Sequence, residues 1–161
     1  MPIEHADGMG HIVIADPSIR KFRLHHRLRL GLLRRGHRVS ILCTERVRFT
    51  FWREQVADVD VLGPSNRKEY PDSIREMLEA IEPHRDARRA RKIATAAHHW
   101  FARELPDLVV LHEARSAIST RIELPAHATG CRVLWSGEGL LPHTMQIDES
   151  GLDANASHRR W

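Results

Sequence analysis

The stretch HIVIADPSIRKFRLHHRLRLGLLRRGHRVSILCT, residues 11–44, decides the fold class of this chain. It opens on residues 11–16, a short apolar run with β-branched side chains that is typical of a buried strand. Leucines then recur at four-residue steps over residues 19–35, which predicts an amphipathic helix with a basic outer face. Gly36 is expected to end this helix, because glycine is the usual residue just past a helix C-terminus. Residues 38–44 predict a second buried strand, so the stretch forms a strand–helix–strand unit.

The rest of the chain repeats this alternation. Further strands are predicted at 58–63, 107–113 and 131–136, and further helices at 45–56, 74–81, 84–104 and 114–124. Pro125 is expected to close the last helix, because proline lacks the backbone donor that a helix needs. Strands that alternate with helices form a parallel sheet covered on both faces. The sequence therefore predicts an α/β fold with about five parallel strands and helices on both faces.

The composition is that of one globular domain. The chain has 161 residues, of which 42% are hydrophobic and 29% charged, and this balance separates it from disordered proteins. No apolar run approaches the ~20 residues of a membrane span, and the N-terminus lacks the segments of a signal peptide. A cytoplasmic protein is therefore expected. Cys43 and Cys131 lie in strand-like runs and are interpreted as small buried hydrophobic residues.

The chain is basic, with a net charge of +4 and a pI of about 9.7. A nucleic acid, an anionic small molecule, an anionic membrane surface or a merely solvated basic helix face would each account for this. The few aromatic residues do not alternate with the basic runs, so no specific nucleic-acid partner is expected. The twelve histidines include no pair at metal-helix spacing with a glutamate, so no metal site is expected.

Ligands of open α/β sheets bind at the carboxyl ends of the strands. In this chain those ends are residues 16–18, 44–45, 112–115 and 136–141. Gly8 and Gly10 precede the first strand, whereas a dinucleotide fingerprint needs its glycines between strand and helix.

Glu138 is the most informative residue at this edge. It stands between Gly137 and Gly139 after the fifth predicted strand, and the glycines are expected to form a tight turn that exposes its carboxylate. One interpretation is a loop charge or a helix-capping anion. The other is a carboxylate that attacks or stabilises a cationic carbon, as glycosyl transfer requires.

Two segments resemble known glycosyltransferases. LRLGLLRRGHRVSIL, residues 28–42, resembles the first helix and second strand of nucleotide-sugar glycosyltransferases built from two Rossmann-like halves. GEGLLPHTMQIDESGLDANAS, residues 137–157, resembles the signature of capsular-polysaccharide biosynthesis and export proteins, which include transferases of 3-deoxy-manno-octulosonic acid (Kdo). The positions that keep the order of this signature are Glu138, Gly139, Leu140, Pro142, Ile147, Asp148, Gly151, Leu152 and Ser157. Leu141 and Asp153 depart from it, and Asn155 stands close to the usual asparagine position.

The resemblance implies a function and a domain plan. Residues 1–136 would form the acceptor-side Rossmann-like domain, and residues 137–161 would lead to a second domain that this chain lacks. The enzyme would transfer Kdo from CMP-Kdo, or another nucleotide sugar, to a lipid- or glycan-linked acceptor at the inner face of the membrane, with no further cofactor. Glu138 would be the nucleophile. The substrate pocket would be lined by Gly137, Gly139, Pro142, His112, Arg115, Asp148 and Asn155.

Two other hypotheses stay open at this point. The chain could be a non-catalytic α/β module that assists capsule export or binds an anionic partner through its basic helices. It could also be a truncated, pseudogene-like product without activity. If the chain ends at residue 161, the transferase hypothesis would need a partner chain to supply the nucleotide-binding half.

Overall fold

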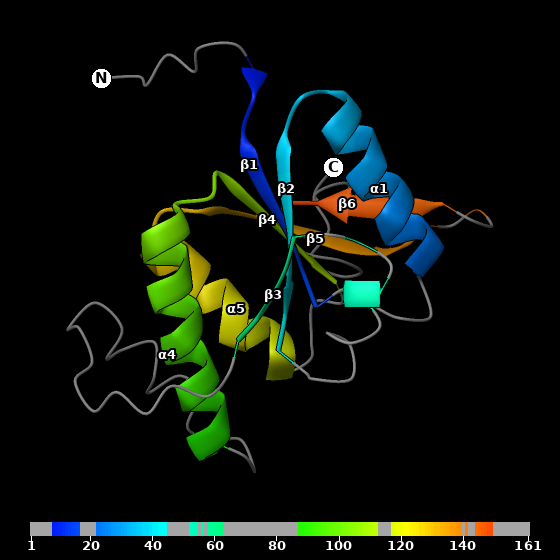
Figure 1. Ribbon diagram of the computed structural model, residues 1–161. Helices are drawn as coiled ribbons and strands as arrows, with labels where there is room; N and C mark the ends of the chain where they lie inside the picture. Colours follow the sequence, from blue (N-terminus) through cyan, green and yellow to red (C-terminus); the bar gives the residue numbers. More distant parts are fainter. Residues whose placement is uncertain are drawn as a thin grey trace.

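A six-stranded sheet forms the centre of the structure, a computed structural model that describes residues 8–16, 22–44, 52–54, 56, 58–62, 87–112, 117–139, 141 and 144–149 (Figure 1). Its strands are β1 (His11–Ala15), β2 (Arg38–Cys43), β3 (Val59–Val61), β4 (Leu108–His112), β5 (Arg132–Glu138) and β6 (Met145–Asp148). Their spatial order is β3-β2-β1-β4-β5-β6, with β1 to β5 parallel and β6 antiparallel to β5. This confirms the predicted α/β class and the five parallel strands, in the order typical of doubly wound sheets.

Helices cover both faces of this sheet, as predicted. They are α1 (Phe22–Arg34), α4 (Ala87–Glu104) and α5 (Ala117–Ala128). α1 packs on one face, which we call the α1 face, and α4 and α5 pack together on the other, the α4–α5 face (Figure 1). The helix predicted at 74–81 lies outside the described residues, and the one at 45–56 is described only at 52–54 and 56. None of the helices in the described part of the chain is long and apolar enough to cross a bilayer.

Burial on both faces explains the continuous apolar runs of the strands. In β1, Val13 and Ala15 join the hydrophobic cluster under α4 and α5, whereas Ile14 joins the cluster under α1. Successive strand residues point to opposite faces, so a strand covered on both sides needs apolar residues throughout. Cys43 and Cys131 are buried in these clusters, as predicted. Burial raises the pKa of the Cys131 thiol to about 12, which keeps it protonated and unreactive.

The α1 helix ends where the sequence predicts. Gly36 has a φ of 86°, in the left-handed region, and its N–H donates to the Leu33 carbonyl at 3.0 Å. The N–H of His37 donates to the Leu32 carbonyl at 3.2 Å, which completes a Schellman motif. Only glycine adopts this φ without steric cost, so the Gly36 signal in the sequence is a structural requirement.

The predicted end of α5 at Pro125 is wrong. The helix continues through Pro125 to Ala128. Proline removes one backbone hydrogen bond from a helix, but Ile122 and Ala126 on either side of it are fully buried in the core and hold the segment in place. The helix instead closes at Gly130, whose φ is 79°, with the Cys131 N–H donating to the Ala126 carbonyl at 2.9 Å.

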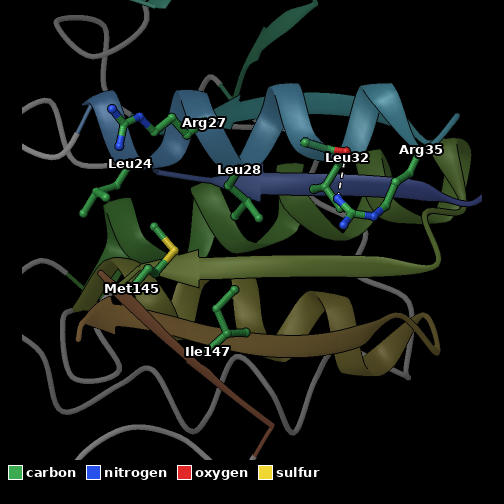
Figure 2. A pocket seen from close by; sticks show the side chains of 8 residues that line it. Leu24, Arg27, Leu28, Leu32, Arg35, Met145 and Ile147 are labelled. Atoms are coloured by element: carbon green, nitrogen blue, oxygen red, sulfur yellow. Dashed lines mark hydrogen bonds between the residues drawn. The ribbon is translucent and has the colours of Figure 1, made fainter. Parts of the chain in front are cut away.

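A groove separates α1 from β6 on the α1 face (Figure 2). It has a volume of about 370 Å³. Leu24, Leu28 and Leu32 project into it from α1, opposite Met145 and Ile147 of β6 (Figure 2). Gly31 and two arginines complete the lining, Arg27 and Arg35.

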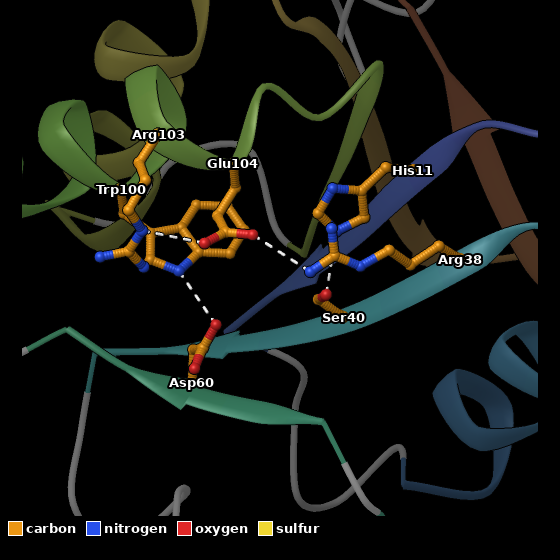
Figure 3. A network of polar contacts seen from close by, with 7 residues as sticks. All are labelled: His11, Arg38, Ser40, Asp60, Trp100, Arg103 and Glu104. Atoms are coloured by element: carbon orange, nitrogen blue, oxygen red, sulfur yellow. Dashed lines mark hydrogen bonds and ion pairs between the residues drawn. The ribbon is translucent and has the colours of Figure 1, made fainter.

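On the α4–α5 face, a polar network ties α4 to β2 and β3 (Figure 3). The indole N–H of Trp100 donates to the Asp60 carboxylate at 3.0 Å, which links α4 to β3. Glu104, the last residue of α4, accepts hydrogen bonds from Arg103 at 2.9 Å and from Arg38 at 3.1 Å. These bonds hold the pKa of the Glu104 carboxyl below its usual value. The network fixes the C-terminal end of α4 against the sheet.

His11 is buried beside this network. Its Nε2 lies 2.9 Å from the Ser40 hydroxyl, and its ring lies 6.3 Å from the Trp100 ring, centroid to centroid (Figure 3). Burial lowers the pKa of His11, and the nearby Arg38 charge lowers it further. Both effects favour the neutral form of the imidazole in the folded protein.

We expect the free energy of unfolding to fall as the pH drops from about 7.5 to about 5.5, because unfolded histidine, with a pKa near 6.5, takes up its proton before folded His11 does. A His11→Gln variant should show a shallower slope. Some slope should remain, since burial and the neighbouring His99 also lower the pKa of His98. Urea unfolding at a series of pH values measures both slopes, and identical slopes would contradict the burial of a neutral His11.

Candidate functional site

The β5–β6 hairpin presents Glu138 at the carboxyl end of the parallel sheet. Glu138 is the last residue of β5, it is exposed, and it pairs with Met145 of β6. The expected tight turn across Gly137 and Gly139 is wrong in its position, because β5 runs on through Gly137 and Glu138. The chain turns after Gly139, whose N–H donates to the Thr144 carbonyl at 3.0 Å. The segment after the turn is extended and forms β6.

Position 139 requires glycine because Thr144 packs directly against it across the hairpin. A Cβ built at Gly139 would collide with the Thr144 hydroxyl oxygen, and would lie 2.9 Å from the Thr144 Cβ and 3.1 Å from its carbonyl carbon. The Thr144 hydroxyl itself donates to the Leu141 carbonyl at 2.6 Å, so it is held in place. The glycine therefore permits the close approach that closes the hairpin and sets the position of Glu138.

A Gly139→Ala variant should be destabilised by about 1–3 kcal/mol, the usual cost of overpacking, and its melting temperature should fall by several degrees. The matched control is Gly31→Ala in α1, where the nearest atom to a new Cβ is the Arg35 guanidinium at 3.7 Å. That change should be neutral or stabilising, because alanine favours a helix over glycine. Thermal unfolding of the two variants tests this, and equal melting temperatures would contradict the account of Gly139.

His112 and Ser136 lie on the same face of the sheet as Glu138. His112, the last residue of β4, pairs with Ser136 of β5, and Ser136 is two residues before Glu138. Alternation along β5 places Ser136 and Glu138 on one face, about 7 Å apart along the strand. The Ser136 hydroxyl donates to the Leu111 carbonyl at 3.0 Å. Two of the predicted site residues, His112 and Glu138, are thus brought together on the α1 face.

Aromatic side chains of α1 pack against this part of the sheet. His25 is fully buried, and its ring meets the His112 ring edge to face with centroids 4.8 Å apart. The neighbouring His26 ring stacks on the Phe22 ring instead, with centroids 5.1 Å apart. Phe22 in turn contacts Trp52 at 4.9 Å. His25 is the residue that the sequence did not single out: adjacent histidines on a helix carry no signal of which one faces the sheet.

Other predicted site residues are placed differently. Asp148 is buried and pairs with Trp135, whose side chain belongs to the cluster under α4 and α5. Because paired strand residues share a face, the Asp148 side chain lies on the face opposite Glu138. Gly137 and Gly139 flank Glu138 in the hairpin as described above. Three predicted residues lie outside the described residues, Arg115, Pro142 and Asn155.

Hydrogen bonds of one side chain join the carboxyl ends of β1 and β2. The Asp16 carboxylate accepts hydrogen bonds from the Thr44 N–H at 2.7 Å and from the Thr44 hydroxyl at 2.6 Å. Asp16 has a φ of 42°, a backbone conformation uncommon for residues other than glycine but tolerated by aspartate. This part of the edge, one of the positions expected to meet a ligand, is used to join two strands.

Metal ligands do not gather at this edge in the described ranges. No group of three or more histidine, cysteine, aspartate or glutamate residues there has the arrangement of a metal site. The chemistry that the described edge offers is that of a carboxylate, an imidazole and a hydroxyl on one face of the sheet.

Comparison with known proteins adds no relative: no protein-family model matches the chain, and no curated protein sequence matches it significantly.

Proposed function

We propose that this chain is the acceptor-side domain of a capsular-polysaccharide glycosyltransferase, a Rossmann-like half of a two-domain enzyme. The observation that carries the proposal is the position of Glu138, exposed at the end of β5 where the parallel strands end. Ligands of doubly wound sheets bind at this edge. The strand order and the helices on both faces support the Rossmann-like assignment.

In this proposal Glu138 is the nucleophile of a double displacement. A carboxylate oxygen of Glu138 forms a bond to the anomeric carbon of the donor sugar, the bond from that carbon to CMP breaks, and CMP leaves with the electron pair. A hydroxyl oxygen of the acceptor then attacks the same carbon, and the Glu138 carboxylate leaves. The hydroxyl gives its proton to a base. The product keeps the anomeric configuration of the donor, because each displacement inverts it once.

His112 is our candidate for that base. It shares the α1 face with Glu138 through its pairing with Ser136, and the buried His25 ring fixes the orientation of its own ring. Histidine is the side chain that enzymes use most often to accept a proton from a reacting hydroxyl. Arg115, which follows the fourth predicted strand in the sequence, is assigned to the carboxylate that Kdo itself carries, since guanidinium groups bind carboxylates in two-pronged geometry.

The donor nucleotide requires a second binding half in this proposal. A further domain or a partner chain would hold CMP opposite the edge that carries Glu138, at the inner face of the membrane. Pro142 and Asn155 are assigned to the substrate pocket by the resemblance alone, and Gly137 and Gly139 would shape the lip of the cleft.

A transfer assay with the native protein tests this function. Incubation with CMP-Kdo and a lipid-linked glycan acceptor should yield one added sugar and one CMP per product. UDP-glucose and GDP-mannose serve as control donors and should give far less product. If no donor yields product with the native protein at its native size, the transferase proposal is wrong.

A second function rests on the charge of α1. This helix contains no acidic residue. Three of its arginines are exposed, Arg23, Arg27 and Arg34, and so is Arg35 just beyond its end. Such a surface would suit a non-catalytic module that binds an anionic partner, with capsule export as one setting. Salt-sensitive binding to anionic vesicles, unchanged by Glu138→Gln and accompanied by no transfer, would favour this function over the first.

A further inference from the structure

We propose that the groove between α1 and β6 binds a lipid phosphate, with its apolar chain along α1 and its phosphate at Arg27. The orientation rests on the proposed function, because it places the head group at the end of the groove nearest Glu138. The binding site itself rests on the lining of the groove.

The walls of the groove are apolar along its length. Leu24, Leu28 and Leu32 form one wall at successive turns of α1, and Met145 and Ile147 form the other (Figure 2). Ile147 remains 43% exposed although it is a large apolar residue. From Arg27 to Arg35 the chain rises about 12 Å, which is most of the ~15 Å that half the hydrocarbon core of a bilayer measures. The volume of about 370 Å³ falls in the range of ligand pockets.

The two charged residues of the lining are both arginines. Arg27 is exposed and makes no hydrogen bond or ion pair with any residue in the described part of the chain. Arg35 donates to the Gly31 carbonyl at 3.3 Å, a neutral acceptor, and forms no ion pair with a residue in the described ranges. α1 contributes no acidic residue. A groove with apolar walls and the arginines Arg27 and Arg35 is complementary to a lipid phosphate, whose chain is apolar and whose head group is anionic.

The position of the groove selects the Arg27 end for the head group. Met145 lines the groove and pairs directly with Glu138 across the hairpin. A lipid phosphate held at Arg27 would present a sugar linked to that phosphate toward the carboxyl edge of the sheet. Its chain would then extend toward Ile147 and Arg35, away from the reacting carboxylate.

The test compares three probes below their micelle concentrations, measured by calorimetry: dodecyl phosphate, dodecyl maltoside and inorganic phosphate. Dodecyl phosphate should bind roughly tenfold more tightly than dodecyl maltoside, because only it gains a charge-assisted hydrogen bond. Inorganic phosphate should bind far more weakly than either. Equal affinities for the two dodecyl compounds, or equal affinities for the two phosphates, would overturn the proposal.

Variants locate the site. Arg27→Gln should reduce the affinity for dodecyl phosphate to that for dodecyl maltoside, whereas Arg34→Gln, an exposed arginine of α1 outside the groove, should change neither. Ile147→Glu, at a position that is 43% exposed, should weaken both dodecyl probes at least about tenfold. If Arg34→Gln weakens dodecyl phosphate as much as Arg27→Gln does, the groove is not the site.

A Glu138→Gln variant separates this inference from the proposed function. It should bind dodecyl phosphate as the unchanged protein does, because Glu138 does not line the groove. A protein that transfers sugar but fails the probe test would overturn the lipid site alone. A protein that binds the lipid through Arg27 but transfers no sugar would overturn the transferase proposal alone.

Discussion

Replacing Glu138 with glutamine should reduce sugar transfer by at least about a thousandfold. Glutamine has the same shape but lacks the charged oxygen that attacks the anomeric carbon, and losing a nucleophile usually costs this much or more. A thousandfold loss corresponds to about 4 kcal/mol of transition-state stabilisation. The fall should appear in kcat, while the KM for the acceptor changes little.

The matched control for this change is Glu149→Gln. Glu149 is also an exposed glutamate, it follows β6 in the same hairpin, and it pairs with Arg132. Surface ion pairs of this kind contribute little to stability, and Glu149 lies outside the proposed machinery, so this variant should transfer sugar at close to the normal rate. Both variants should have the same melting temperature within about 2 °C. Normal transfer by Glu138→Gln would remove the nucleophile assignment.

The second large effect is expected on stability, from Trp100→Ala. Trp100 is only 5% exposed, it meets Phe101 edge to face at 5.2 Å, and its indole N–H bonds to Asp60. Truncating a buried tryptophan costs about 3–5 kcal/mol through lost burial and the cavity left behind. The total free energy of unfolding of a typical domain is only about 5–15 kcal/mol. We therefore expect the melting temperature to fall by roughly 6–20 °C.

Two further variants separate the causes of that loss. Trp100→Phe keeps most of the apolar contact but removes the hydrogen bond to Asp60, whose exposed carboxylate water can reach, so its cost should be about 0.5–1.5 kcal/mol. Leu105→Ala truncates a leucine that is 69% exposed just after α4, and should cost less than about 0.5 kcal/mol. Denaturant unfolding measures the loss in free energy of unfolding for each of the three variants. A loss for Trp100→Ala no larger than that for Leu105→Ala would contradict the burial of Trp100.

The fold was predictable where local sequence carries the signal. Apolar runs of β-branched residues marked the five parallel strands, and Gly36 marked the end of α1, because both features follow from local backbone geometry. The end of α5 was wrongly predicted at Pro125 because the deciding interactions there are not local. The local penalty of the proline is real, but tertiary burial of Ile122 and Ala126 outweighs one lost hydrogen bond.

The site was predictable only in part. Glu138 and His112 stand at strand ends, so the rule for parallel sheets brought them to one edge. The contact between His25 and His112 joins positions far apart in the chain and has no local signal. Asp148 was assigned to the site with Glu138 because both keep the order of the family signature, yet the register of β6 places Asp148 on the other face. The groove likewise depends on how α1 lies relative to β6, which only the folded chain defines.

The most direct test of the central claim is the mass of the native protein after incubation with CMP-Kdo in the absence of an acceptor. A double displacement leaves the sugar bonded to the nucleophile until an acceptor arrives. The account predicts a mass increase of one Kdo residue, located on the peptide that contains Glu138 and absent from the Glu138→Gln variant. A sugar found on a different residue, or transfer that proceeds with no trapped sugar on Glu138, would contradict it.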